Sequence, residues 1–359
     1  MSHPQRVLVA VADAEDFVVR VMGAHGVPAA DAAVVAQCLL RADLRGVTTH
    51  GLMRLPVYTD RLRRRLVSAR PDLVVTQTTA ATARVDGGNA LGFVVAHRAM
   101  SEAIALAREA GIGMVGARHS NHFGMAASYV LQATETGLAA MVFTNASPAM
   151  PPWGGREPLL GTSPLAFGVP RPGGRSIVLD MSPSVASRGK IRQAARRGEQ
   201  IPAGWALDSG GAPTTDPAAA LRGVVLPMGG PKGSGLSLFM DIFAGVLTGA
   251  AFAGDVGDQY KDFDRAQDVG HLFLALRPDL FVPAREFASR VETLAGRIGQ
   301  GPLAAGFGEI LLPGEGEERA EARHRAEGIS YTQGDIDLLR AEADRAGVKP
   351  LALRGPSVS

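Results

Sequence analysis

The stretch Gly111-Ile112-Gly113-Met114-Val115-Gly116 decides which kind of α/β fold the sequence specifies, because it spells the G-x-G-x-x-G pattern of a dinucleotide-binding turn. In a Rossmann unit this pattern follows a strand and opens a helix. Here residues 96–110 carry a strong helical pattern that Gly111 ends, and residues 113–117 have the pattern of a buried strand. The helix precedes the glycines and the strand follows them, so we predict a fold that is not a Rossmann fold.

An α/β region extends outward from this helix and strand. Short β-rich runs alternate with helical patterns and with Gly- and Pro-rich loops. The predicted strands cover residues 73–76, 83–86, 139–144, 165–169, 176–179 and 269–276, and residues 149–155 are predicted as a loop. Apolar residues at helical spacing predict a largely buried helix at 236–247 and another inward-facing helix at 286–298, whereas residues 184–222 show no regular pattern.

Helical patterns occupy both ends of the sequence. An apolar stripe at helical spacing runs along residues 13–24, and a second stripe runs along residues 34–42. Thr332 is a suitable N-cap for a last amphipathic helix. The second helix leads into the segment around His50, so we expect a packed helical pair to hold that segment.

The composition is that of an ordinary globular protein, with 359 residues, 46% apolar and 20% charged. With 37 basic and 35 acidic residues the formal charge is only +2, so neither nucleic acid nor an anionic membrane is an expected partner. The single cysteine, Cys38, excludes an intramolecular disulfide. No signal-peptide pattern opens the sequence, and the longest apolar stretch is too short for a membrane span, so we expect a cytoplasmic protein.

The segment from Arg45 to Arg54 carries the most suggestive chemistry. If this segment is helical, His50 and Arg54 lie four residues apart on one face. A histidine can exchange a proton with a substrate oxygen near neutral pH, and an arginine can hold a carboxylate by two parallel hydrogen bonds. The pair therefore suits a small acid whose hydroxyl or carbonyl lies beside its carboxylate. The alternative is a capped helix start with a surface histidine and a solvated arginine.

The run Arg41-Ala42-Asp43-Leu44-Arg45-Gly46-Val47-Thr48-Thr49-His50-Gly51 resembles the malate/L-lactate dehydrogenase family that lacks a Rossmann domain. This family also contains ureidoglycolate, sulfolactate and diketogulonate oxidoreductases and cyclic imino acid reductases. The likeness continues in order along nearly the whole chain, through His119-Ser120-Asn121-His122-Phe123-Gly124, Gly161-Thr162-Ser163-Pro164, Asp180-Met181-Ser182, Lys232-Gly233-Ser234-Gly235-Leu236 and Pro313-Gly314-Glu315. Each block is weak alone, but the ordered set is specific.

The resemblance implies an α/β fold with a mixed β-sheet, a helical lobe formed by both chain ends, and a homodimer. The corresponding division of the chain has three parts. These are a helical lobe at residues 1–70 and 315–359, a cofactor-binding and dimerisation region at 71–180 and 225–314, and an irregular segment at 181–224 that borders the active site.

The resemblance also implies hydride transfer between NAD or NADP and a small 2-hydroxy or 2-oxo carboxylate. In this interpretation His50 exchanges the proton with Thr49 as its hydrogen-bond partner, Arg54 holds the carboxylate, and Thr162 lies at the neighbouring substrate oxygens. Lys190 favours a hydroxy acid, because cyclic imino acid reductases of the family carry an aspartate close to this position. A cyclic imine such as Δ1-piperideine-2-carboxylate is the alternative substrate. A non-catalytic carboxylate-binding protein is a more distant alternative.

Several loops are candidate cofactor sites. Residues 119–126 follow a strand and lead into a helix, so their backbone amides could face an anion, and the start of the helix after Lys232 offers a cation and free amides. By resemblance, the cofactor contacts are His122, Phe123, Gly124, Met125, Ala126, Asp180, Met181, Ser182, Lys232, Gly233, Pro313, Gly314 and Glu315. We expect no metal at the H-x-x-H spacing of His119 and His122, because no acid or cysteine accompanies it in the sequence.

Overall fold

The structure is a computed structural model that describes residues 6–353. The outermost parts of the predicted helical lobe, residues 1–5 and 354–359, lie outside the described residues. Among the described helices, none has both the length and the apolar character that a membrane span requires.

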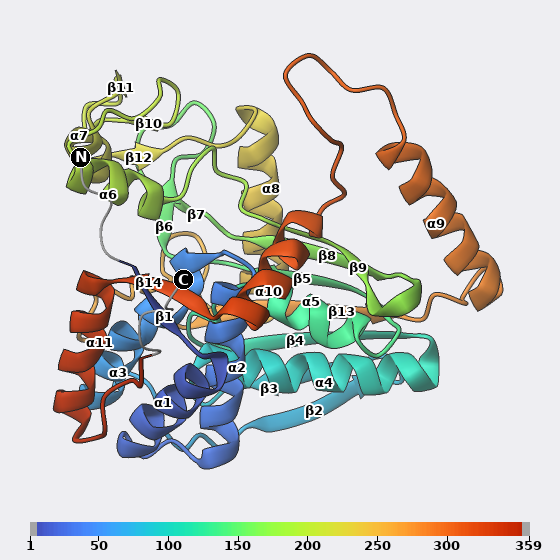
Figure 1. Cartoon of the computed structure of the whole chain (residues 1–359), viewed down its shortest axis with the longest axis horizontal. Helices are drawn as coiled ribbons and strands as arrows, with labels where there is room; N and C mark the ends of the chain where they lie inside the picture. The colour runs from blue at the N-terminus through green and yellow to red at the C-terminus, as the bar shows by residue number, and fades with distance from the viewer. Residues whose placement is uncertain (1–5, 354–359) are drawn as a thin grey trace.

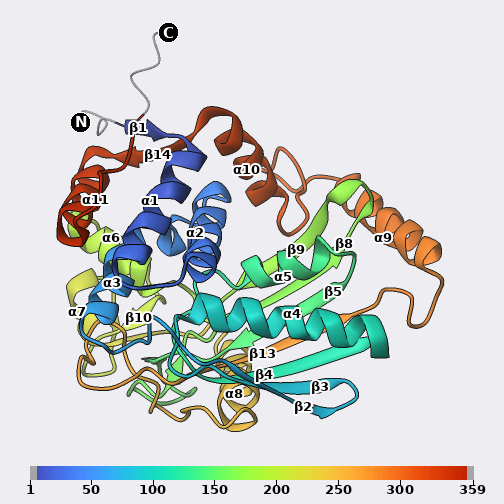
Figure 2. The ribbon, with the colours of Figure 1, turned by 90° about the horizontal axis from the view of Figure 1, so that it is seen from below.

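A seven-stranded mixed sheet forms the centre of the molecule, as the resemblance implied. Its strand order is β2-β3-β4-β13-β5-β8-β9, and only the neighbours β3 and β4 run parallel. The strands are β2 Val74–Thr79, β3 Thr82–Asp86, β4 Ile112–Ser120, β13 Val269–Leu276, β5 Ala139–Thr144, β8 Leu165–Pro170 and β9 Ser176–Met181. Helices α4 (Gly92–Ala110) and α5 (Ala127–Thr134) cover one face, and α8 (Pro231–Asp241) lies on the other (Figure 2).

The glycine-rich stretch has the predicted order of elements, which confirms that it is not a Rossmann turn. Helix α4 ends at Gly111 in a left-handed conformation with φ 85°, and β4 begins at the next residue. Gly113 lies where β4 crosses α4, and a Cβ atom there would be 2.1 Å from the carbonyl oxygen of Ala103. This glycine allows the strand to pack directly on the helix.

Both chain ends build the helical lobe. Helices α1 (Val11–Ala24), α2 (Ala29–Leu44), α3 (Leu55–Arg63) and α11 (Gln333–Ala346) group together beside the sheet (Figure 1). Strand β1 (Arg6–Val9) pairs antiparallel with β14 (Ile329–Thr332), so residues more than 300 positions apart share one ribbon. Thr332 caps α11 through its bond with the Asp335 amide, as predicted, and α10 (Glu315–Glu327) packs on α2.

Residues 184–222 are more regular than the sequence indicated. They contain α6 (Arg188–Arg197) and α7 (Pro217–Arg222), while β11 (Pro213–Thr214), β10 (Ala206–Leu207) and β12 (Val224–Val225) form a small sheet. Helix α6 buries only Ile191, so its sequence lacks an apolar stripe. The predicted loop at 149–155 also begins within a short strand, β6 (Pro148–Met150), which pairs with β7 (Leu160–Gly161).

Two predictions of buried helices are wrong for the single chain. Helix α8 and the π-helical turn Ile242–Val246 leave Phe239 54% and Leu247 59% exposed. Helix α9 (Ala284–Gly299) stands apart from the body of the molecule and leaves Leu294 57% exposed (Figure 1). An apolar stripe shows that one face of a helix avoids water, but it does not say which molecule covers that face.

Candidate active site

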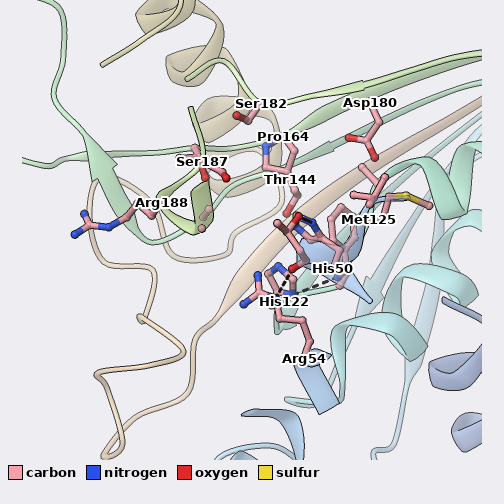
Figure 3. Close-up of a pocket in the computed structure, with 18 of the residues that line it drawn as sticks. His50, Arg54, His122, Met125, Thr144, Pro164, Asp180, Ser182, Ser187 and Arg188 are labelled. Atoms are coloured by element: carbon pink, nitrogen blue, oxygen red, sulfur yellow. Dashed lines mark hydrogen bonds between the residues drawn. The ribbon is translucent and has the colours of Figure 1, made fainter. Parts of the chain in front are cut away.

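A cavity of about 520 Å³ opens where the helical lobe, the sheet and α6 meet (Figure 3). This volume lies in the range of small-molecule and cofactor sites. Its walls come from segments far apart in the sequence: residues 45–54, 122–127, 144–149, 178–182, 187–192 and 258–260, with Thr162, Pro164, Gln267, Val269 and Glu317 between them.

The segment that carries His50 and Arg54 is not the single helix that the spacing suggested. It forms two short 3-10 helices, Thr48–His50 and Leu52–Arg54, on either side of an extended Gly51. A Cβ atom at Gly51 would fall 1.8 Å from a carboxylate oxygen of Asp43. Burial raises the pKa of Asp43 to about 6.

The buried Asp43 carboxylate fixes this break in the helix. One of its oxygens accepts hydrogen bonds from the Leu52 amide and the Tyr331 hydroxyl, both at 2.7 Å. The sequence offered no signal for this contact, because Tyr331 is 288 residues further along the chain. The contact ties the segment to β14 and thereby to the other end of the chain.

The His50 imidazole lies beside the Thr49 hydroxyl, as the resemblance implied. The Thr49 Oγ1 atom is 2.9 Å from His50 Nδ1, and the His50 ring stacks on the His122 ring with centroids 5.7 Å apart. Burial, and after it the charge of Arg54, lowers the pKa of His50 to about 3. His50 is therefore neutral at physiological pH, and its Nε2 atom makes no hydrogen bond to another described residue.

The His122 ring has both a backbone and a side-chain partner, because its Nδ1 atom accepts the Gly124 amide at 3.3 Å and also contacts a tyrosine hydroxyl. Its Nδ1 atom is 2.8 Å from the Tyr58 hydroxyl on α3, and burial lowers its pKa well below the usual value. His119, by contrast, bonds Asp86 on the other side of the loop. The two histidines of the H-x-x-H spacing thus have separate partners, and no described group of His, Cys, Asp or Glu residues forms a metal site.

Arg54 presents its guanidinium fork to the cavity. Its Nε donates to the Thr49 carbonyl at 2.9 Å, while its two terminal nitrogens make no hydrogen bond within the described chain. Figure 3 shows Arg54, His50 and His122 close together on one wall. Thr162, in the link between β7 and β8, lines the same cavity, and its hydroxyl has no partner among the described residues. Arg54 and Thr162, the two residues predicted to bind substrate, therefore face the same cavity, and each has a hydrogen-bond donor without a partner among the described residues.

The loop between β4 and α5 forms a second wall. His122, Phe123, Gly124, Met125 and Ala126 all line the cavity. Asp180, Met181 and Ser182, at the end of β9, line it as well. The Ala127 amide at the start of α5 donates to an Asp180 oxygen at 2.7 Å, and burial raises the Asp180 pKa to about 6.

The expectation that amides of this loop are free for an anion is wrong for three of them. The amide of His122 donates to the Gln267 side chain, that of Gly124 to the His122 ring, and that of Ala127 to Asp180. The Phe123 ring is 2% exposed and belongs to the core. These bonds fix the shape of the loop. A ligand in the cavity would therefore contact small side chains of the loop rather than free backbone amides.

Five predicted cofactor residues do not line this cavity: Lys232, Gly233, Pro313, Gly314 and Glu315. Pro313 and Gly314 lie one layer behind it, because the Pro313 carbonyl accepts the amide of the lining residue Val178 and the Gly314 carbonyl accepts a bond from the lining residue Arg45. Lys232 is exposed.

The amides at the start of α8 are also not free, because the preceding turn supplies their acceptors. The Gly233 amide donates to the Met228 carbonyl at 2.9 Å, and a Cβ atom on Gly233 would lie 2.4 Å from the Pro183 carbonyl oxygen. Gly233 therefore packs behind the wall that Ser182 forms.

The resemblance implied that residues 181–224 border the active site, but it did not single out the residues that form the wall opposite His50. Ser187, Arg188, Gly189 and Arg192 of the α6 region line the cavity together with residues 258–260. Tyr260 lies within 5.5 Å of the Arg54 guanidinium carbon, measured to the ring centroid. The basic pattern of α6 resembles an ordinary solvated helix face, so no signal in the sequence distinguished Arg192.

The residues present fit a nicotinamide nucleotide. Asp180 keeps one carboxylate oxygen without a partner in the described chain, and such an oxygen can accept a ribose hydroxyl. The adjoining wall consists of small side chains, which admit a flat ring and a sugar: Gly124, Ala126, Ala127, Ala146 and Ala149.

Comparison with known proteins identifies the family of the chain. The model of the malate/L-lactate dehydrogenase family matches residues 9–340. An L-sulfolactate dehydrogenase from Methanothermobacter thermautotrophicus is 40% identical over 319 residues, which are 89% of this chain and 91% of the relative. The structure of malate dehydrogenase from Pyrococcus horikoshii has a TM-score of 0.89 at 33% identity and covers 98% of this chain and 99% of its own.

A third similar protein belongs to the other substrate class considered above. The structure of a Δ1-piperideine-2-carboxylate reductase from Pseudomonas syringae has a TM-score of 0.85 at 34% identity, covering 94% of this chain and 99% of its own. The names of other relatives specify NADP in one case and NAD in another.

The fold and the comparisons thus define a dehydrogenase without a Rossmann domain. The chain belongs to the malate/L-lactate dehydrogenase family, as the ordered sequence blocks predicted. The predicted enzyme class, an NAD- or NADP-dependent oxidoreductase of 2-hydroxy acids, is confirmed at the level of this family.

Proposed function

We propose that this chain transfers a hydride between NAD or NADP and a small 2-hydroxy or 2-oxo carboxylate of the malate, lactate or sulfolactate type. One observation carries the proposal: a neutral histidine and an unpaired arginine fork face the same cavity beside the wall of small residues. The bound nicotinamide would accept or supply the hydride at C2 of the acid. The chain supplies orientation and proton exchange.

In this mechanism Arg54 binds the carboxylate by its two terminal nitrogens, and Thr162 donates to a neighbouring oxygen. During oxidation His50 takes the hydroxyl proton on Nε2, while its Nδ1 bonds Thr49. During reduction His50 must carry that proton before it gives it to the carbonyl oxygen. Binding of the carboxylate neutralises Arg54, whose charge helps to lower the pKa of His50, so substrate binding and proton uptake are coupled.

Replacement of His50 tests the proposal. We expect His50→Ala to reduce turnover on the order of 100-fold or more, since general acid–base help is worth ~10²–10⁴-fold. Affinity for NADH, followed by quenching of protein fluorescence, should change little. A fully active variant would remove His50 from the mechanism, and a chain that binds no nicotinamide nucleotide would be the carboxylate-binding protein.

Reduction of a cyclic imine is the second candidate, and the similarity to the piperideine-carboxylate reductase supports it. The same Arg54 and His50 would serve that reaction. Lys190, which favours the hydroxy acid by resemblance, is exposed and does not line the cavity. A panel of 2-oxo acids and cyclic imines, each with NADH and NADPH, separates the two activities and gives the cofactor preference.

We also propose a cytoplasmic homodimer with the division of the chain given above. The support for the dimer is the apolar surface on α8 and its π-helical extension, since monomers rarely expose large apolar patches. Its exposed side chains are Leu238, Phe239, Ile242, Phe243, Val246 and Leu247. Light scattering after gel filtration should give a dimer mass, and Leu247→Glu should shift it toward the monomer. A wild-type monomer at micromolar concentration would refute this assembly.

A further inference from the structure

Two arginines of the cavity approach one aromatic ring. The guanidinium carbon of Arg192 lies 5.0 Å from the centroid of the Tyr260 ring, and that of Arg54 lies 5.5 Å from the same centroid. All three residues line the cavity. Arg54 comes from the wall that carries His50, and Arg192 comes from α6 on the opposite wall. The ring therefore brings a second cation into the space that the substrate would occupy.

Arg192 has no anionic partner among the described residues, and its guanidinium makes no hydrogen bond there. The neighbouring Arg188 is different, because it donates to the carbonyls of Leu221 and Gly223 and thereby ties α6 to the C-terminal end of α7. Figure 3 shows the Arg188 side chain directed away from His50 and Arg54. The Arg188 guanidinium thus bonds backbone carbonyls and has a structural role, whereas the donors of the Arg192 guanidinium have no acceptor among the described residues.

The charges around the cavity are unevenly distributed. Asp180 and Glu317 belong to the cofactor side of the lining, and Asp258 is the acid on the side of Arg192. The Asp258 carboxylate already caps its own loop by accepting the Tyr260 amide at 2.8 Å. Burial, and to a smaller extent the charge of Arg192, lowers the pKa of Arg54. Neither Arg54 nor Arg192 forms an ion pair with a carboxylate of the described residues, and two such guanidinium groups in one cavity favour a ligand with two negative charges.

We propose that Arg192, held in place by Tyr260, is a specificity residue that binds a second anionic group on the substrate. The substrate class is then a 2-hydroxy or 2-oxo acid with a carboxylate or sulfonate on C3. Arg54 binds the C1 carboxylate, and Arg192 binds the group at C3. This inference rests on the proposed function, and it explains why one cavity for a small acid contains two unpaired arginine forks.

The test compares a dianionic with a monoanionic substrate. We expect Arg192→Gln to lower kcat/KM for oxaloacetate about 10–100-fold, the range for the loss of a charge-assisted hydrogen bond, and to lower it less than about 3-fold for pyruvate. Arg192→Lys should restore part of the oxaloacetate activity. Arg196→Gln is the matched control, because it removes the same charge from an exposed position one turn further along α6. It should leave both activities unchanged.

The outcomes distinguish a failure of the role of Arg192 from a failure of the proposed function. Equal losses of Arg192→Gln on both acids, or no loss on either, overturn the role of Arg192 while the proposed function stands. A wild-type enzyme that uses neither acid with NADH or NADPH but reduces cyclic imines overturns the proposed function and this inference with it. Melting curves for each variant must show a folded protein, and a lower oxaloacetate rate in Arg196→Gln would reveal a nonspecific effect of charge.

Discussion

The pH dependence of catalysis should differ between the two directions of the reaction, because the surroundings of His50 favour its neutral form. The pKa of His50 is about 3, against an ordinary value of 6.5. Reduction needs a protonated His50, and kcat/KM reports the enzyme before it binds the acid. Each unit of pH above 4 therefore lowers the protonated fraction, and kcat/KM for a 2-oxo acid, about tenfold. Oxidation needs the neutral form, so its kcat/KM should be flat from pH 5 to pH 8.

The interval from pH 5 to pH 6 discriminates between a shifted and an ordinary histidine. A pKa near 3 predicts about a tenfold fall in this interval, while an unshifted histidine would lose only about 1.3-fold. The assay is the initial rate of 2-oxo acid reduction at saturating NADH and subsaturating acid, measured in buffers of constant ionic strength.

A second titrating group in the cavity requires a control. The pKa of Asp180 is about 6, so its ionisation falls within the measured interval. The variant Asp180→Asn should keep the tenfold fall between pH 5 and pH 6. A flat profile in both proteins would show that His50 either is not the proton donor or is not shifted in the enzyme that awaits substrate.

Three further predictions concern Arg54, two glycines and a buried histidine. Arg54→Lys should raise the Michaelis constant of several 2-oxo acids, because an ammonium cannot reproduce the planar fork, and the loss should be roughly 1–3 kcal/mol; an unchanged constant would contradict the role of Arg54. Gly113→Ala should lower the melting temperature but leave the NADH dissociation constant of the folded protein unchanged, because its Cβ would meet α4. Gly233→Ala should weaken NADH binding, because its Cβ would push the wall formed by residues 182–184. The reverse pattern in NADH titrations would show that the cofactor binds at the 111–116 turn. His271 is fully buried between the Thr144 and Ser120 hydroxyls, and burial lowers its pKa to about 3. The folded state thus resists protonation of His271. Below pH 6.5 the free energy of unfolding of the wild type should therefore fall, relative to that of His271→Gln, by about 1.4 kcal/mol per pH unit. Urea denaturation at pH 5 and pH 7 measures this, and the same difference between the two proteins at both pH values would refute it.

Local patterns predicted the elements whose cause is local. The helix that ends at Gly111 and the strand after it depend on residues within one stretch, so their order was evident without the structure. The break at Gly51 was not evident, because a carboxylate on the preceding helix and a tyrosine near the end of the chain together impose it. The exposure of α8 was missed for another reason: the same apolar stripe arises whether a helix packs on its own chain or on a partner.

The candidate site shows the same division between residues that chemistry reveals and residues that only folding reveals. His50 and Arg54 belong to a motif whose residue types suggest acid chemistry, whereas the family resemblance indicated Thr162, and all three line one cavity. Arg192 lies in a run of arginines that a solvated helix also carries, so its position beside Tyr260 depends on a contact between α6 and a loop more than 60 residues away.

The two sides of the cavity rest on different parts of the core, which has a consequence for substrate choice. The segment with His50 and Arg54 is tied by Asp43 and Tyr331 into the large core of the helical lobe and sheet. Helix α6 instead packs through Ile191 into a small separate cluster that includes Met150 and Ile201. Changes in that cluster can therefore reposition Arg192 with little effect on the proton-transfer pair, so substitutions on α6 should alter which acid is used more readily than they abolish turnover.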